Sequence, residues 1–521
     1  MFVVFPIYFL IGKLRCLEIY TITHTMDTVK RRKQALHEVA TIAGACDAQQ
    51  LFSGYVVRRQ PVKFSGVDCE VESEKFQIDK IVDYLGYDGA LKVERRDAHG
   101  FGGGRQRQDM FLGELVEKLR GGDDSYYLTT QYEREEIEEG EEEEGESEEE
   151  EDASEEEDDE SEQESEEIDE GDAENSGIDK NIFGENDAED EDDENNHSDE
   201  NDENNSPSSS SLPAPLHDDY IDLSPEEVSY RVRELFQPPL TPHKLPVSPS
   251  LFPTLVPQQI NLWMGRCNKR ASLVELDESR PDLGLGRYVP NGQSSGLHHD
   301  HADNLYILVS GRKRFTIFPP SSGPSLATVG TIRTIYDTGV IDYEHDEKAP
   351  FWRHIRDDGA LETEVLRWKS DRNEPIDETV ILQEEERLQQ ASSPDTALQN
   401  SPASAPPSFS TIPPALLHAD ELDEKNQKLV AAFASKTYPE LLAVPRYTVW
   451  LQKGEMLYLP AGWFHEVTSF GDNENDIHIA INYWFAPPNA PSFDSPYKDN
   501  YWPSDFARTR EAVSEWSLEE N

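Results

Sequence analysis

The chain has 521 residues, a formal net charge of −59 and an apolar fraction of 36%. The length is enough for two to four domains, but this apolar fraction is low for a chain that is globular throughout. Much of the sequence is therefore not packed core, and its strong negative charge argues against direct binding of nucleic acid.

An apolar run of about a dozen residues opens the chain, MFVVFPIYFLIG. A bilayer span needs about 20 such residues, and a secretory signal carries its basic residues before the apolar run, whereas here they follow it. We interpret residues 1–25 as an N-terminal extension or as sequence preceding a start at Met26. An amphipathic helix is expected at about 27–45, and another at about 109–120.

The spacing of the cysteines indicates the redox environment in which the protein works. No pair of cysteines has the spacing of a metal or redox motif, which fits a reducing environment. No other segment approaches the length of a membrane span. We therefore expect a cytoplasmic or nuclear protein without a membrane partner. The four cysteines are Cys16, Cys46, Cys69 and Cys267.

Residues 133–204 form an acidic block with 42 Asp or Glu against two basic residues, a net charge of −40. A segment so charged and so poor in apolar residues cannot offset the entropy lost on ordering. We expect it to be disordered, together with the Ser/Pro-rich stretch that completes an insertion at 133–216. It is either a contact surface for basic proteins or a solubilising spacer.

The triplet His298-His299-Asp300 is the first motif that carries chemistry. Alternate side chains of a strand share a face, so His298 and Asp300 can converge on one ion. His299 and His301 then point the other way. With a second imidazole from elsewhere, this pair makes the 2-His-1-carboxylate arrangement, which leaves open positions on non-haem Fe(II).

Lys313 lies fifteen residues after the first histidine of that motif, in GRKRFTIFPP. We expect this strand to return antiparallel beside the metal strand. Alternation places Lys313 on the side of Phe315 and Ile317, with Arg312 and Arg314 on an opposite, exposed side. A buried ammonium at this place suits a dicarboxylate, whose far carboxylate it would hold.

Two further insertions are expected. Residues 267–292 are either a surface loop over the mouth of the site or retained non-coding sequence. A longer insertion runs from about 321 to 440. Its middle, within about 372–418, is rich in Ser, Pro and Ala and is predicted to be disordered. Apolar residues at helical spacing predict a helix within 421–444.

The second imidazole is expected from KGEMLYLPAGWFHEV, where His465 ends an apolar run broken by Pro-Ala-Gly. A single histidine there is more often a core or surface residue. Because His298 and Asp300 already offer two donors, we expect His465 to be the third metal ligand. Short β-branched and aromatic runs predict strands at 305–309, 314–318, 446–451, 456–459 and 477–485.

Three segments of the chain resemble the Jumonji-C (cupin-8-like) family of Fe(II)- and 2-oxoglutarate-dependent oxygenases in order and spacing. The resemblance is closest to the small lysyl hydroxylase subfamily and more distant to the asparaginyl hydroxylase called factor inhibiting HIF. The upstream pieces YVVRRQPVKFSG, SYYLTTQ and INLWMG resemble the N-terminal half of the family. The three main segments are GLHHDHADNLYILVSGRKRFTIFPP, GEMLYLPAGWFHEV and IAINYWF.

The resemblance implies roles for particular residues of this chain. The implied Fe(II) ligands are His298, Asp300 and His465. The implied partners of the distal carboxylate of 2-oxoglutarate are Lys313 and Tyr127, and the implied neighbours of the co-substrate and metal are Ser295, Asn304 and Asn482. Hydroxyl and amide groups suit such a site because they donate to a carboxylate without adding charge.

The predicted strands and the resemblance together indicate a mainly β fold, a double-stranded β-helix or cupin-type jelly roll with flanking helices and long disordered insertions. We expect the catalytic domain to consist of 26–132 and 217–500, since the acidic insertion separates pieces that the family keeps in one domain. Residues 501–521 are expected to form a C-terminal tail.

The resemblance further implies a dioxygenase that hydroxylates a protein side chain and couples this to decarboxylation of 2-oxoglutarate to succinate and CO₂. The nearest subfamily indicates a lysyl side chain. One alternative is N-methyl-lysine demethylation. Another is a non-catalytic acidic scaffold, which the intact ligand set argues against. The expected partner is a protein substrate, and the acidic insertion would suit a basic one. The chain itself could form a homodimer. The ionisable His299, His301 and Glu466 receive no catalytic role.

Overall fold

The computed structural model describes residues 36–96, 107–131, 223–267, 276–280, 282–391, 405–471 and 476–519. The predicted extension 1–25 lies outside the described residues, as does nearly all of the acidic insertion 133–216. None of the helices in the described part is long and apolar enough to cross a membrane.

Two sheets face each other around a shared interior. The larger has nine strands in the order β2-β3-β14-β9-β16-β7-β6-β4-β5, and the smaller has five in the order β1-β13-β10-β15-β8. The strands of the larger sheet are β2 (Ala40–Ala43), β3 (Val62–Ser65), β4 (Ala90–Arg95), β5 (Arg107–Phe111), β6 (Tyr126–Leu128), β7 (Pro257–Arg266), β9 (Asp303–Ser310), β14 (Met456–Leu459) and β16 (Ile477–Phe485). Those of the smaller sheet are β1 (Leu36–His37), β8 (Gln293–Ser294), β10 (Arg312–Phe318), β13 (Arg446–Gln452) and β15 (Phe464–Phe470).

Successive strands alternate between the sheets, as a double-stranded β-helix requires. The chain passes from β9 to β10 through Gly311, whose φ of 80° is a left-handed conformation that glycine adopts without strain. It alternates again from β14 to β15 and from β15 to β16. Leu308 of one sheet and Phe315 of the other belong to the same buried cluster. The predicted fold class is confirmed.

The strands on either side of the acidic insertion are neighbours. β6 pairs antiparallel with β7, with Tyr127 opposite Gly265. Residues 126–128 and 257–266 therefore belong to one sheet, although the whole acidic segment separates them in sequence.

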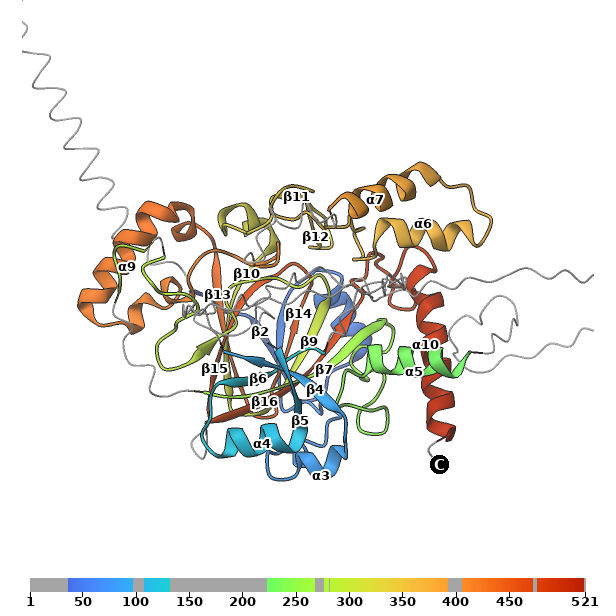
Figure 1. Ribbon diagram of the computed structural model, residues 1–521, viewed down its shortest axis with the longest axis horizontal. Coiled ribbons are helices and arrows are strands. Elements are labelled where there is room, and N and C mark those ends of the chain that lie inside the picture. The colour runs from blue at the N-terminus through green and yellow to red at the C-terminus, as the bar shows by residue number, and fades with distance from the viewer. Residues whose placement is uncertain are drawn as a thin grey trace, which may run out of the picture.

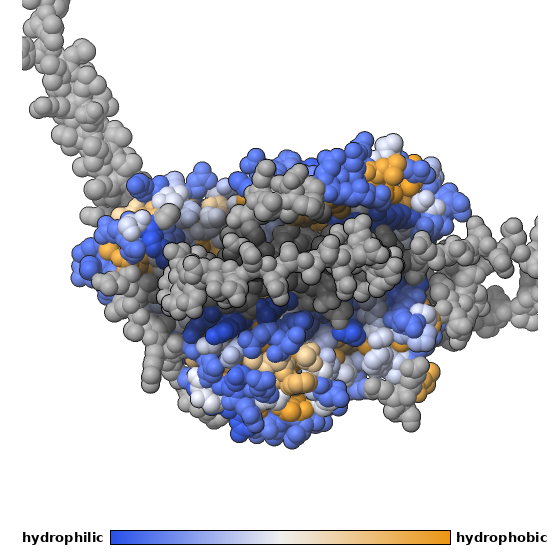
Figure 2. Space-filling model, in the orientation of Figure 1, coloured by the Kyte–Doolittle hydropathy of each residue, from blue (hydrophilic) through white to orange (hydrophobic). Residues whose placement is uncertain are grey.

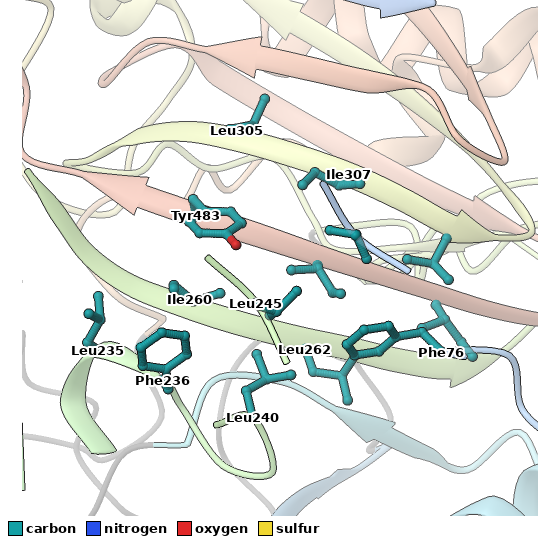
Figure 3. Packing of buried hydrophobic residues seen from close by; sticks show 14 of the residues in the cluster. Phe76, Leu235, Phe236, Leu240, Leu245, Ile260, Leu262, Leu305, Ile307 and Tyr483 are labelled. Atoms are coloured by element: carbon teal, nitrogen blue, oxygen red, sulfur yellow. The ribbon is translucent and has the colours of Figure 1, made fainter. Parts of the chain in front are cut away.

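The outer face of the large sheet carries the main apolar core. Leu305 and Ile307 of β9 point away from the shared interior, and Tyr483 of β16 lies beside them (Figure 3). Figure 3 also shows Ile260 and Leu262 of β7 packing toward the loops that cover this face. Strand alternation thus divides β9 into an apolar outer set and an inner set available for a site.

Helices lie around the barrel rather than within it. In Figure 1, α5 and α10 lie side by side at one edge, α9 lies at the opposite edge, and α3 and α4 lie beneath the large sheet. The predicted helices at about 109–120 and within 421–444 are confirmed as α4 and α9. The α-helices are α2 (Ala48–Leu51), α3 (Ile81–Leu85), α4 (Leu112–Arg120), α5 (Pro225–Leu235), α6 (Glu362–Ser370), α7 (Glu378–Ala391), α9 (Glu424–Thr437) and α10 (Tyr501–Glu519).

The remaining elements are short. They are the π-helical turn η1 (Phe52–Val56), the 3₁₀ turns η2 (Pro320–Ser325), η3 (Pro414–Leu416), η4 (Ala419–Glu421) and η5 (Pro439–Leu442), and the hairpin of β11 (Ile332–Ile335) and β12 (Ile341–Tyr343). The described surface in Figure 2 is mainly hydrophilic, with a small apolar area near α7, where Leu382 is 62% exposed.

The structure corrects two predictions near the N-terminus and in the second insertion. The described end of the predicted helix 27–45 forms β1 and β2, because parallel pairing with β13 and β3 outweighs local helical preference. The segment 372–418, predicted to be disordered, contains α7 and a well-packed stretch from 405. Ile412 and Leu417 are buried there, so this stretch has the apolar anchors that a disordered segment lacks.

The predicted C-terminal tail 501–521 is also wrong, because it forms α10. Its buried Trp502 and Ala512 face the body of the protein. Arg231 of α5 donates to the Asp505 carboxylate of α10 at 2.9 Å, which fixes one helix against the other.

A buried carboxylate ties the barrel strands together. Asp303, at the start of β9, is 0% exposed and accepts hydrogen bonds from the Arg59 guanidinium, from the Tyr458 hydroxyl at 2.5 Å and from the Ala461 backbone N–H at 2.9 Å. Arg59 also accepts at its carbonyl from the Trp463 indole at 3.0 Å. One ion pair therefore fixes β9, β14 and the turn that precedes His465.

We expect Arg59→Met to lower the free energy of unfolding by about 3–5 kcal/mol, because it leaves the Asp303 carboxylate buried and unpaired. Urea denaturation measures this change. Lys428→Met is the control: it removes the ion pair of Lys428 with Glu424, whose side chains are 75% and 85% exposed, and should cost about 0.5 kcal/mol or less. Equal losses in the two variants would contradict the central role of Asp303.

Candidate metal centre and groove

Three side chains meet at the mouth of the barrel. His298, Asp300 and His465 offer ligand atoms that lie within 4.8 Å of one another, and His465 Nε2 is 3.6 Å from Asp300 Oδ2. The rings of the two histidines lie 4.3 Å apart between centroids. Two imidazoles and one carboxylate on one side of an ion are the donor set of a non-haem Fe(II) site.

The tautomers of both histidines suit metal binding. Nδ1 of His298 lies 3.1 Å from the Gly296 carbonyl, and Nδ1 of His465 lies 2.9 Å from the Trp463 carbonyl. A carbonyl only accepts, so each Nδ1 carries the proton and each Nε2 keeps its lone pair for a metal. Burial and the neighbouring His465 hold the pKa of His298 well below its usual value, which favours the neutral ligand form.

The backbone brings these ligands together across 165 residues of sequence. His298 and His465 exchange backbone hydrogen bonds of 3.0 and 2.7 Å, and the Gly462 N–H donates to the Asp300 carbonyl at 2.9 Å. Gly462 has a φ of 72°, and a Cβ there would lie 1.7 Å from the Gly339 carbonyl oxygen. Only glycine fits this turn, which aims His465 at the motif.

The alternate histidines of the motif turn away from the three ligands. His299 Nε2 is 2.5 Å from the Tyr343 hydroxyl, and the His301 ring lies 5.2 Å from that of Trp352. Strand alternation therefore distributes the side chains as expected, although only His298 of this segment forms a strand bridge.

Lys313 lies deeper in the interior. It is 1% exposed, its Nζ donates to Ser469 Oγ at 2.5 Å, and burial lowers the pKa of its ammonium to about 8. Its neighbour strand differs from the prediction: β10 pairs with β15, which carries His465, and not with the strand of the motif. The reason is that β15 lies between the two segments, because it pairs with β10 on one side and with β8 and His298 on the other.

The predicted exposure of Arg314 is wrong. Its side chain is buried on the outer face of β10, where it donates to Thr468 Oγ1 at 3.1 Å and pairs with Glu421. The segment around η4 covers this face. The alternation was correct, but the outer side of the strand is packed rather than solvated.

The predicted asparagines form a chain of amides that ends on the metal carboxylate. The Trp263 indole donates to Asn482 Oδ1 at 2.7 Å, Asn482 Nδ2 donates to Asn304 Oδ1 at 3.1 Å, and Asn304 Nδ2 lies 3.4 Å from Asp300 Oδ2. Such partners orient a ligating carboxylate. Asn304 and Asn482 are thus placed beside the centre.

Tyr127 and Ser295 are placed differently. The Tyr127 ring lies 6.0 Å from Lys313 Nζ, between the two sheets. The Ser295 hydroxyl donates to the Gly296 carbonyl at 2.9 Å and accepts from the Val467 N–H at 3.1 Å. Ser295 therefore joins the two ligand segments, while its contact with 2-oxoglutarate stays a prediction.

Residues that the sequence did not single out complete the centre. Phe409 stacks on His298 with ring centroids 4.8 Å apart and planes 10° apart, and the Arg287 guanidinium lies 4.8 Å from the Phe409 ring. Both come from the two insertions, and no sequence signal places them here. Ser469 could have been found, since alternation from His465 puts it on the same face.

Glu466 belongs to a separate network on the outer face of β15. Its carboxylate accepts from Ser294 at 2.6 Å, Thr468 at 2.8 Å and His418 Nε2 at 2.8 Å. It points away from the metal ligands, so its structural contacts account for its burial.

A cavity of about 340 Å³ opens from His298 and Asp300 and extends to α5 and α10. Its lining includes six aromatic side chains beside aliphatic ones, and its charged lining includes Arg231, Glu234 and Asp505. We call it the aromatic groove. Its aromatic residues are Tyr230, Trp352, Phe409, Trp484, Trp502 and Phe506.

Comparison with known proteins gives both a family and relatives. A family model described as a cupin-like domain matches residues 48–491. The chain is 29% identical over 335 residues to JmjC domain-containing protein 4 of Schizosaccharomyces pombe, which covers 52% of this chain and 63% of that protein. It is 23% identical over 230 residues to Lysine-specific demethylase JMJ32 of Arabidopsis thaliana, covering 44% of this chain and 42% of that protein. The matches thus span less than two thirds of either relative.

We expect Asp300→Ala to weaken Fe(II) binding by more than about 100-fold in anaerobic calorimetry, because loss of a ligand should exceed the 10–100-fold effect of an outer partner. His301→Gln, one residue further along, should bind Fe(II) like the wild type, since its ring points elsewhere. Comparable losses in both variants would contradict the ligand assignment.

Proposed function

This chain belongs to the cupin-like domain family, and we propose that it is an Fe(II)- and 2-oxoglutarate-dependent dioxygenase that hydroxylates a protein side chain. The observation that carries the proposal is the convergence of His298, Asp300 and His465 beside a closed interior that holds Lys313. Fe(II) bound there, with 2-oxoglutarate and O₂, supplies oxidation of a C–H bond coupled to decarboxylation of 2-oxoglutarate to succinate and CO₂.

The positions of the ligands and of Lys313 suit a five-carbon dicarboxylate. His465 pairs with Ile317 and Ser469 pairs with Lys313, so the two levels are four residues apart on β15. That is about 13 Å along the strand, at about 3.3 Å per residue. The co-substrate and the lysine side chain together can bridge this span.

The protein's own groups bind, orient and exclude water. The Lys313 ammonium holds the distal carboxylate by a charge-assisted hydrogen bond. Asn304 orients the Asp300 carboxylate. Between these levels the interior is apolar, with Phe315 and Leu308 buried, which keeps water from the reacting centre. No general base from the protein is required.

The aromatic groove supports a lysyl side chain as the substrate group. A lysine places four apolar methylenes against aromatic walls and carries a cation that aromatic faces attract. The groove begins at His298 and Asp300, so a side chain lying in it would bring its C–H bonds to the metal. The net charge of −59 favours a basic protein as the bearer of that lysine.

N-methyl-lysine demethylation is the second candidate, and the name of the Arabidopsis relative, a lysine-specific demethylase, favours it. Hydroxylation of the methyl carbon would release formaldehyde by the same chemistry. Mass spectrometry of cellular proteins with and without the Asp300→Ala variant separates the two: a hydroxylase adds one oxygen to its substrate, whereas a demethylase removes a methyl group.

We expect the purified protein with Fe(II) to convert 2-oxoglutarate slowly to succinate without substrate, and Asp300→Ala to abolish this turnover, because the ligand set is then incomplete. Succinate is measured by NMR against a metal-free control. Wild-type protein that binds neither Fe(II) nor 2-oxoglutarate in calorimetry would overturn the proposed function.

We expect Lys313→Ala to raise the Michaelis constant for 2-oxoglutarate by about tenfold or more, the value of one charge-assisted hydrogen bond. The pKa of about 8 also predicts a pH dependence: Lys313 is protonated below pH 8 and loses its charge above it. Wild-type affinity for 2-oxoglutarate should therefore fall as the pH rises past 8.

The matched variant for this pH dependence is Lys313→Arg, whose guanidinium stays protonated. Its affinity for 2-oxoglutarate should be flat across the same range. A wild-type profile that is equally flat, or an unchanged Michaelis constant in Lys313→Ala, would place the co-substrate anchor elsewhere.

A further inference from the structure

His478 is a buried polar residue that the ligand set and the implied co-substrate residues leave out. It lies on β16, is 0% exposed, and neither ring nitrogen has a hydrogen-bond partner among the described residues. Buried polar groups in native proteins are nearly always paired, and an unpaired one calls for an explanation. A bound ligand is one such explanation.

His478 and Lys313 share the Tyr127 ring as a neighbour. The His478 and Tyr127 rings lie 5.7 Å apart, and the Tyr127 ring lies 6.0 Å from Lys313 Nζ. Burial first, and then the Lys313 ammonium, hold the pKa of His478 well below its usual value. The imidazole is therefore neutral, with one N–H donor and one acceptor nitrogen.

Two glycines give these rings their space. A Cβ at Gly265 would lie 2.5 Å from the Tyr127 ring and 3.2 Å from His478 Cε1. A Cβ at Gly311 would lie 2.9 Å from the His478 Cβ and 2.8 Å from the Phe470 carbonyl oxygen. A side chain at Gly265 would displace the Tyr127 ring, and one at Gly311 would collide with the Phe470 carbonyl and the base of the His478 side chain.

Lys313 and His478 have more N–H groups than the described residues accept from them. Lys313 Nζ has three N–H groups, and among the described residues its hydrogen bond goes to the Ser469 hydroxyl. His478 adds a ring N–H. A carboxylate accepts several hydrogen bonds at once and would supply what both donors need.

We propose that His478 binds the distal carboxylate of 2-oxoglutarate together with Lys313, so that the co-substrate is held by a neutral N–H donor as well as by an ammonium. This inference rests on the proposed function and goes beyond it by assigning a residue of β16 to the co-substrate. His478 then adds to Lys313 in distinguishing a dicarboxylate from a 2-oxo acid with an apolar end.

The test compares two ligands that differ only at the distal end. 2-Oxoglutarate and 2-oxopentanoate share the 2-oxo acid group, but the second ends in a methyl group. Calorimetry with Mn(II) in place of iron measures binding of each without turnover. His478→Phe keeps a ring and removes both nitrogens, and His478→Gln keeps an N–H donor.

We expect His478→Phe to weaken 2-oxoglutarate binding about tenfold and to leave 2-oxopentanoate unchanged, because only the first ligand has the carboxylate. His478→Gln should recover part of the loss. Thr316→Val is the matched control, since it removes a buried hydroxyl that has no partner among the described residues, on the opposite face of the Lys313 strand. It should leave both affinities unchanged.

Equal weakening of both ligands in His478→Phe would show a merely structural role and overturn the inference, as would an unchanged affinity for 2-oxoglutarate. Thermal unfolding checks that each variant is folded, and His478→Leu replaces the Phe variant if that one does not fold. Wild-type protein that binds Mn(II) but not 2-oxoglutarate would overturn the proposed function and this inference with it.

Discussion

The carboxylate of Asp303 is the contact on which the geometry of the site depends. It is fully buried and receives the Arg59 guanidinium, the Tyr458 hydroxyl and the Ala461 N–H. These groups belong to the N-terminal part of the chain, to β14 and to the turn before His465. Because Asp303 lies three residues after Asp300, the same ion pair positions both halves of the ligand set. The buried charge is costly to leave unpaired, so this arrangement has few alternatives.

Around this contact the barrel interior has three levels. The ligand candidates His298, Asp300 and His465 lie at the mouth, apolar side chains such as Phe315 line the middle, and Lys313 lies at the far level with Ser469. Strand alternation points these side chains inward, and their positions along β10 and β15 set the order of the levels. A linear dicarboxylate with one end at the metal and one at an ammonium matches such an interior, and the outer faces are left for apolar packing and for the Glu466 network.

Parts of the chain outside the barrel line the approach to the candidate metal centre. Phe409, from the end of the second insertion, covers one face of the His298 ring. The helix α10 supplies Trp502 and Phe506 to the aromatic groove, and it lies beyond the residues 48–491 that the cupin-like domain model matches. The barrel is therefore shared with the family, whereas the walls of the groove come partly from segments outside that match.

The sequence alone predicted the barrel strands, the metal candidates and Lys313, because each rests on local spacing: a period of two along a strand or a motif in one short segment. The barrel itself was predicted from these strands together with the resemblance to the Jumonji-C family. The sequence did not determine which strands are neighbours. The pairing of β10 with β15, the burial of Arg314, the order in 405–418 and the helix α10 all depend on contacts between residues far apart in sequence. For the same reason only the tertiary structure placed His478 beside Lys313. The local sequence pattern determines on which face of a strand a side chain lies. The packing of distant segments determines which residues that side chain contacts.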